Sequence, residues 1–291
     1  MAIKKLFCFG LGYSAQYIVR DIARDCIKAG VSVVGTTRTP ENRARLLQQG
    51  FSDVVLFDGK TPIPDFLAAH DDTSHVLCSI VPNAHGDAAF IHHVEALNAL
   101  THLEWTGYLS TTGVYGDHQG NWVTEDTPVA PISPRAQHRV LAEKQWLSLN
   151  IPANIFRLAG IYGHGRSALE RVKDGTAQRI YKAGHVFSRI HVEDIAQIVC
   201  ASMQGGRNGR VYNCADDDPA PPQEVIEYAA TLLGMPIPPL IPYEHAVLSD
   251  MAQSFYAECK RVDNTRVKQE LGVVLRYPTY REGLQGLKSE A

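Results

Sequence analysis

The sequence lacks any long apolar run. No segment approaches the roughly 18 consecutive apolar residues of a membrane-spanning helix. Residues 1–9 hold two lysines and a short apolar run that leads into a glycine turn. A signal peptide would instead carry a longer apolar stretch and a small-residue cleavage site. We therefore expect a cytoplasmic protein with no membrane partner.

The sequence also lacks an excess of charge of either sign and any paired cysteines. Its formal net charge is −3 over 291 residues, whereas a nucleic-acid-binding surface is usually strongly basic. No nucleic-acid partner is therefore expected. The six cysteines are scattered without C-x-x-C spacing, mostly in apolar contexts, which predicts free thiols in a reducing compartment.

Short apolar runs and amphipathic stretches alternate along the first half of the chain. The runs predict strands, and the stretches between them predict helices. The predicted strands are 6–9, 31–36, 54–57, 75–80, 108–110 and 154–158, and the predicted helices are 15–29 (closed by Gly30), 40–49, 87–103 and 133–149. This alternation is typical of parallel strands joined by crossover helices. The sequence predicts an α/β fold with a Rossmann-type, doubly wound parallel sheet.

The alternation breaks up after Leu158. Pro-rich stretches at 219–222 and 236–242 flank a predicted helix at 223–233, and a short strand is predicted at 210–213. We predict an NAD(P)-binding domain over residues 1–160. Residues 161–291 are predicted to form a smaller C-terminal α/β lobe, interleaved with the sheet and laid over its C-terminal edge.

A glycine motif follows the first predicted strand. Residues 9–15 (FGLGYSA) fit G-x-G-x-x-A at the start of a helix. Gly10 permits a tight turn, Gly12 lets the backbone approach a pyrophosphate, and Ala15 permits close helix–strand packing. Tyr13 begins the helix, whose first N–H groups are free to bind phosphate. The motif predicts a dinucleotide site; the alternative is a plain glycine-rich turn.

The residues after the next three strands indicate which dinucleotide is bound. An NAD site usually has an acidic residue after the second strand, but this chain has Thr37 and Arg38. A guanidinium suits a 2′-phosphate, so NADP is favoured over NAD unless Arg38 is a solvated loop residue. Asp58 is predicted to contact adenine or to form a turn. Ser79 and Ile80 are predicted to line the nicotinamide side.

Four further stretches carry a family resemblance. They are residues 110–116 (STTGVYG), 157–163 (RLAGIYG), 189–196 (RIHVEDIA) and 211–213 (VYN). With the glycine motif, they resemble the extended short-chain dehydrogenase/reductase superfamily, the NAD-dependent epimerases and dehydratases of nucleotide sugars. The resemblance spans nearly the whole chain.

The resemblance places the family's catalytic Ser or Thr at Thr111 and Ser110 beside the cofactor. The family then has a Tyr-x-x-x-Lys motif, whose tyrosine is the acid/base and whose lysine lowers the tyrosine pKa and holds the ribose. Here Arg135 stands at the tyrosine position and Arg139 at the lysine position. Because arginine does not exchange a proton near neutral pH, the chain resembles atypical members that lack this pair.

The other residues of these stretches extend the predicted site. We predict substrate-side roles for Tyr115, Arg157, Tyr162, Arg166 and His191. Tyr115, Tyr162 and His191 are the candidate proton donors, with packing roles as the alternative for Tyr115 and His191. Gly160 stands where typical members have Asn, which removes a usual contact to the substrate diphosphate.

These observations support two hypotheses of function. The first is an NAD(P)-dependent oxidoreductase or epimerase/dehydratase-like enzyme for a small polar or phosphorylated substrate such as a sugar derivative. Arg135 and Arg139 would then bind an anion or the cofactor phosphates. Thr111 would then hydrogen-bond the reacting carbonyl or hydroxyl. The second is a non-catalytic NAD(P)-binding regulator or redox sensor. The basic, glycine-rich segment 163–167 favours the enzyme.

Histidines gather near one predicted helix and acidic residues in one predicted loop. Histidines 85, 92 and 93 with Glu95 lie near one helix, but adjacent histidines point to different sides of a helix, so no metal is predicted. The acidic segment 216–219 is predicted to be a loop and helix cap.

The helices at 87–103 and 133–149 form the dimer surface in many relatives, so the resemblance implies a homodimer.

Overall fold

Seven parallel strands form the centre of the protein. The structure, a computed structural model, describes residues 3–26, 31–205 and 207–289. The strand order is β11-β7-β5-β4-β1-β2-β3, and every neighbouring pair is parallel. The strands are β1 (Lys5–Phe9), β2 (Ser32–Thr37), β3 (Asp53–Leu56), β4 (His75–Cys78), β5 (Trp105–Thr111), β7 (Asn154–Leu158) and β11 (Val211–Cys214). The predicted Rossmann-type α/β fold is confirmed, and its ligand crevice is expected where the chain order reverses, beside β1 and β4.

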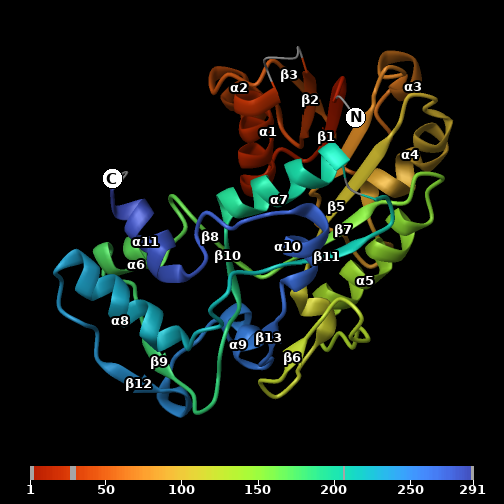
Figure 1. The fold of residues 1–291 in the computed structure, drawn as a ribbon. Helices are drawn as coiled ribbons and strands as arrows, with labels where there is room; N and C mark the ends of the chain where they lie inside the picture. Colours follow the sequence, from red (N-terminus) through yellow and green to blue (C-terminus); the bar gives the residue numbers. More distant parts are fainter. Residues whose placement is uncertain (1–2, 27–30, 206, 290–291) are drawn as a thin grey trace.

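Helices cover both faces of this sheet (Figure 1). One face carries α1 (Tyr13–Cys26), α2 (Pro40–Gln48) and α7 (Val192–Gly205), and the other carries α3 (Phe66–Ala69), α4 (Ala88–Ala99) and α5 (Pro134–Leu147). Side chains alternate between the two faces along a strand. Leu6 and Cys8 of β1 therefore pack in the core under α1 and α7, whereas Phe7 and Phe9 pack in the core under α4 and α5.

Side-chain caps fix where two of these helices begin. Ser133 Oγ accepts from Ala136 N at 3.3 Å before α5, and Asp87 Oδ1 accepts from Ala89 N at 2.9 Å before α4. Such caps satisfy N–H groups that have no partner within the helix. The Ser133 cap fixes the start of α5, the helix that carries Arg135 and Arg139 at the C-terminal edge of the sheet.

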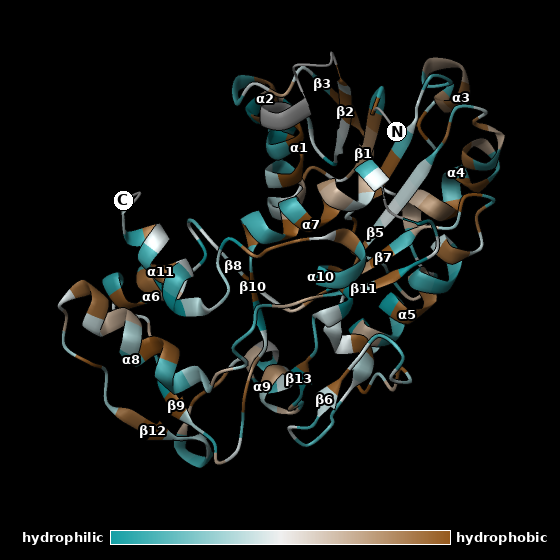
Figure 2. Cartoon of the chain, viewed as in Figure 1, coloured by the Kyte–Doolittle hydropathy of each residue, from teal (hydrophilic) through white to brown (hydrophobic). Residues whose placement is uncertain are grey.

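The second half of the chain adds a lobe with its own core. This core joins α6 (Ala168–Lys173), α8 (Pro222–Leu233) and α11 (Tyr280–Ser289). Outside the central sheet there are three two-stranded parallel pairs: β8 (Gly160–Tyr162) with β10 (Arg189–His191), β9 (Arg179–Tyr181) with β12 (Leu240–Pro242), and β13 (Arg261–Val262) with β6 (Trp122–Val123). The remaining short helices are η2 (Thr112–Tyr115), η3 (Tyr243–His245), α9 (Asp250–Tyr256) and α10 (Thr265–Leu271). Figure 2 shows hydrophobic and hydrophilic residues alternating along the lobe helices, as amphipathic helices over a core require.

The structure differs from the sequence prediction in two elements. The strand predicted at 210–213 in the lobe is β11, which pairs with β7 in the central sheet. The segment 192–205 was not predicted as a helix, yet α7 packs on α1 in the main core. The predicted end of the first helix, residues 27–30, lies outside the described residues. In the part of the chain that is described, no helix is long and apolar enough to cross a membrane.

Close packing at Gly35 yields a test of the fold around the glycine turn. A Cβ added to Gly35 of β2 would lie 2.2 Å from Leu11 Cδ1, and Leu11 is buried. We expect Gly35→Ala to lower the free energy of unfolding by about 1–3 kcal/mol, as overpacking does, measured by urea denaturation. Gly205→Ala in α7, whose Cβ would meet nothing within 4 Å, is the control. Equal effects of the two changes would contradict this account.

Candidate functional site

The glycine turn ties together the ends of three strands. Gly10 has a φ of +89°, its N–H donates to Thr36 Oγ1 at 2.8 Å, and its carbonyl accepts from Ser79 Oγ at 2.5 Å. A Cβ on Gly10 would lie 3.1 Å from Ser79 Oγ and 3.2 Å from Ile80 Cγ1. Glycine is required here both for its backbone conformation and for the close approach of the loop after β4.

The start of α1 is open at Gly12 and carries no acidic side chain. A Cβ on Gly12 would meet no atom within 4 Å, and the first turn of α1 holds no acidic residue. Ala15 is buried in the core under α1. Backbone N–H groups at a helix N-terminus favour a bound anion, and a side chain at position 12 would project into the space they face.

Tyr13 connects the glycine turn to a distant loop. Its hydroxyl donates to His164 O at 3.0 Å, and the Arg166 guanidinium carbon lies 5.7 Å from the centre of its ring. Arg166, predicted on the substrate side, is exposed and lies beside the turn. The structure thus brings together a residue predicted at the cofactor and a residue predicted at the substrate, which are far apart in the sequence.

The end of β2 and the end of β3 hold the residues predicted near adenosine. Thr37 is buried, and its hydroxyl accepts from the Asn42 amide. Arg38 is exposed, and among the described residues no ion pair or hydrogen bond to its guanidinium is found. Asp58 Oδ1 accepts from Lys60 N at 2.9 Å, which is the turn geometry offered as the alternative to an adenine contact.

The arginine at the lysine position is anchored at the C-terminal ends of β4 and β5. Arg139 Nη1 donates to Leu109 O at 2.7 Å, Ile80 O at 3.2 Å and the Tyr108 hydroxyl at 2.8 Å. Arg135, one turn earlier on α5, is exposed. These contacts fix one positive charge at the sheet edge and leave another free to meet a ligand.

Thr111 lies at the end of β5, at the same edge of the sheet. Its Oγ1 accepts from Gly113 N at 3.1 Å and caps η2. The hydroxyl proton remains available for a substrate oxygen. The structure places Thr111 at the C-terminal edge of the sheet with its Oγ1 as the acceptor that caps η2, and its role toward a substrate stays a prediction.

A buried polar network runs beneath this edge and includes three predicted site residues. Ser110 Oγ donates to Glu143 Oε1 at 2.5 Å, and Glu143 accepts from Arg157 through both oxygens, at 2.8 and 3.2 Å. Arg157 Nη1 donates to the Tyr115 hydroxyl at 3.0 Å, which donates to Asn213 Oδ1 at 2.7 Å. The polar atoms of Ser110, Tyr115 and Arg157 are thus bonded within the interior.

Sequence reasoning missed the two acceptors of this network. Glu143 lies four residues after Arg139, so the two share one face of α5. This spacing could have placed Glu143 near the site, but it does not indicate its partner Arg157. Asn213 belongs to the VYN stretch, whose side-chain role depends on β11 joining the sheet. Neither residue has a local pattern that indicates its partner.

Two other predicted residues lie in the junction between sheet and lobe. His191 is 1% exposed and lies between the rings of Tyr162, at 5.1 Å, and Tyr277, at 4.1 Å. Burial lowers the pKa of His191 to about 4, so the ring is neutral at neutral pH. The Tyr162 hydroxyl donates to Thr279 O at 3.4 Å, and burial raises its pKa. Both side chains are enclosed.

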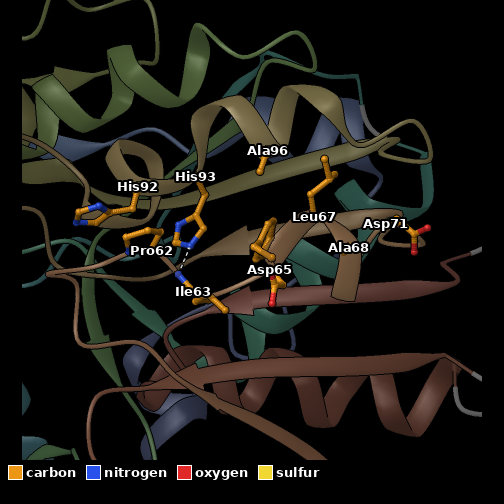
Figure 3. Close-up of a pocket in the computed structure, with 10 residues that line it drawn as sticks. Pro62, Ile63, Asp65, Leu67, Ala68, Asp71, His92, His93 and Ala96 are labelled. Atoms are coloured by element: carbon orange, nitrogen blue, oxygen red, sulfur yellow. Dashed lines mark hydrogen bonds between the residues drawn. The ribbon is translucent and has the colours of Figure 1, made fainter.

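A surface hollow lies away from this edge, between α3 and α4 (Figure 3). Pro62, Leu67, His92 and His93 are among the residues that line it. His93 Nε2 accepts from Ile63 N at 2.9 Å while Nδ1 contacts Ala89 O at 3.0 Å, so both ring nitrogens are used. Within residues 3–26, 31–205 and 207–289, no cluster of three or more His, Cys, Asp or Glu side chains could hold a metal.

The buried ion pair gives a testable stability prediction. The side chains of Arg157 and Glu143 are 7% and 5% exposed, so Glu143→Gln leaves the guanidinium buried without its counter-charge. We expect a loss of about 3 kcal/mol in the free energy of unfolding, measured by urea denaturation. Glu270→Gln, in the half-buried pair with Arg210, should cost about 1 kcal/mol or less. Similar losses would show that the network contributes no special stability.

Similar proteins were found by sequence and by structure. Protein YeeZ of Escherichia coli K12 is 28% identical over 294 residues, covering 95% of this chain and 97% of YeeZ. A protein of Silicibacter pomeroyi DSS, described as a functionally unknown conserved protein, has a TM-score of 0.88 at 44% identity over 99% of both chains. A dTDP-glucose 4,6-dehydratase of Bacillus anthracis, in complex with NAD, has a TM-score of 0.77 at 17% identity, covering 98% of this chain and 96% of the dehydratase.

The family comparison agrees with the resemblance carried by the glycine turn and the four stretches. The model described as the NAD dependent epimerase/dehydratase family matches residues 17–215, which is more than half of the chain. The match includes β5, α5, β7 and α7, the elements that form and flank the sheet edge described above. The chain belongs to the NAD dependent epimerase/dehydratase family.

Proposed function

We propose that this protein is an NADP(H)-dependent oxidoreductase or epimerase-like enzyme in which two arginines occupy the positions of the family's tyrosine and lysine. The observation that carries the proposal is the anchoring of Arg139 by Ile80 O and Leu109 O. These carbonyls follow or belong to β4 and β5, so the guanidinium lies at the crevice where the nicotinamide ribose is expected. Arg135 lies one turn away with its charge exposed.

The residues at this edge suit stabilisation of negative charge. A bound nicotinamide dinucleotide supplies or accepts a hydride. Arg135 provides a positive charge for the oxygen of the reacting group, and Thr111 donates a hydrogen bond to the same oxygen. Neither residue exchanges a proton near neutral pH, so we propose that the substrate proton comes from water or from the substrate itself.

The charges around the dinucleotide site support NADP over NAD. Arg38 follows β2 without an acidic neighbour, and its guanidinium is free for a 2′-phosphate. Arg166 lies beside the glycine turn, where it can reach the diphosphate or an anionic substrate. Residues 161–291 then form the substrate lobe, except for α7 and β11, which complete the sheet and its cover.

A non-catalytic NAD(P)-binding sensor is the second candidate. It is favoured by the enclosed positions of Tyr115, Tyr162 and His191, the three residues considered as proton donors. A homodimer through α4 and α5 and a cytoplasmic location remain predictions. Cofactor oxidation state separates the two functions: an enzyme oxidises or reduces the nucleotide with a substrate, whereas a sensor changes only its binding to a partner.

Calorimetric titration with NADP⁺, NADPH, NAD⁺ and NADH tests the cofactor assignment. We expect NADPH to bind more tightly than NADH. Arg38→Ala should weaken NADPH binding by about tenfold or more, the loss of a charge-assisted hydrogen bond, and leave NADH binding unchanged. Arg45→Ala is the matched control, because Arg45 is an exposed arginine on the adjacent helix α2 whose side chain bonds to Asn42 and Gln49.

Three outcomes would contradict the proposal. Tighter binding of NADH than NADPH would favour NAD, and equal losses in the two variants would reduce the effect of Arg38 to general electrostatics. Failure of all four nucleotides to bind would mean that the fold has lost its cofactor.

A further inference from the structure

The surface hollow between α3 and α4 is a cavity outside the proposed reaction centre. Its volume is about 600 Å³, which lies in the range of small-molecule binding sites. The residues that line it belong to the segment 62–71, which includes α3, and to α4. Figure 1 shows α4 between α3 and α5, so the hollow lies on the side of α4 away from the helix that carries the two arginines. A ligand can therefore occupy the hollow independently of the nucleotide.

The floor of the hollow is apolar and already formed. Phe66 of α3 is 4% exposed, and its ring centre lies 4.9 Å from that of His93. Both ring nitrogens of His93 contact the backbone, at Ile63 and Ala89, so they are not free for a ligand. Leu67 is 38% exposed and adds an apolar side chain to the lining. A ligand here meets a preformed apolar surface.

Two carboxylates, from Asp65 and Asp71, belong to the lining of the hollow. Asp65 precedes α3 but forms no side-chain cap with it. Among the described residues, neither carboxylate has an ion pair or hydrogen bond, and no lysine or arginine lines the hollow. The nearby Lys5 is paired with Asp72 instead, at 2.5 Å. A positively charged ligand would thus find two unpaired counter-charges.

The two carboxylates flank α3, with apolar side chains between them. Asp71 follows Asp65 by six residues, which in a helical segment corresponds to about 9 Å along the axis. Leu67 and Ala68 stand between them and also line the hollow (Figure 3). Carboxylates this far apart do not share one metal ion. The arrangement instead matches a molecule with two cationic ends joined by an apolar chain.

We propose that this hollow is a binding site for an aliphatic diamine. One ammonium group pairs with Asp65 and the other with Asp71, and each offers three N–H donors. The methylene chain lies on Leu67 and Ala68, where its burial is favourable. Because both carboxylates are exposed, each ion pair is weak, and we expect a dissociation constant in the millimolar range. The site does not depend on the proposed function.

Methyl NMR titration of the full chain tests the site with defined probes. The probes are cadaverine, pentylamine, which lacks the second ammonium group, and pentanediol, which lacks both. The ionic strength is kept near about 20 mM, where exposed charges are little screened. We expect cadaverine to shift the methyl signals of Leu67 to saturation. Pentylamine should bind about threefold more weakly, the value of one exposed ion pair, and pentanediol should leave the signals unchanged.

Variants of the two carboxylates test the pairing. Asp65→Asn and Asp71→Asn should each weaken cadaverine binding about threefold, and the double variant should lose it. Asparagine is tolerated in the left-handed conformation of Asp65, whose φ is +50°, so the melting temperature should remain that of the wild type. Asp174→Asn, which changes an exposed carboxylate after α6, is the control and should leave cadaverine binding unchanged.

Four results would overturn the site. Equal affinities of cadaverine and pentylamine would show that the two carboxylates do not act together, and equal losses in all three single variants would reduce the effect to general electrostatics. Shifts that omit Leu67 would place the amine elsewhere. Tighter binding of trilysine than of cadaverine would assign the hollow to a basic segment of a partner protein. NADPH titration is separate: its failure would overturn the proposed function and leave this site standing.

Discussion

The C-terminal edge of the sheet depends on the buried ion pair between Glu143 and Arg157. Glu143 comes from α5 and Arg157 from β7, and their hydrogen bonds extend to β5 through Ser110 and to β11 through Tyr115 and Asn213. Two charges inside the protein need each other and a full set of hydrogen-bond partners. The network therefore specifies how one helix and three strands meet directly below Thr111 and Arg139, which fixes the floor of the proposed site.

Arginines stand at the family's two catalytic positions, above this buried network. Where the family has the flexible ammonium group of a lysine, Arg139 has a planar guanidinium with several N–H donors. Its Nη1 donates to three acceptors of the protein. An arginine held in this way can orient a ligand and balance its negative charge, but it does not exchange a proton. In the proposed function, charge stabilisation by these arginines takes the place of the proton transfer carried out by the family's tyrosine.

The sequence predicted the parts of the structure that local patterns encode. Glycine spacing at Gly10 and Gly12 and strand–helix alternation each depend on a few consecutive residues, and the structure confirms the turn and the fold class. The partners of Arg157 and the pairing of β11 depend on contacts between residues far apart in the chain.

The contact between Tyr13 and His164 has a thermodynamic consequence. It links the first turn of α1, where the proposed function places the nucleotide diphosphate, to the loop that leads from β8 into α6. A ligand that shifts this loop would, through this contact, change the affinity for the nucleotide. Such coupling is reciprocal, so the nucleotide would change the affinity for that ligand by the same factor.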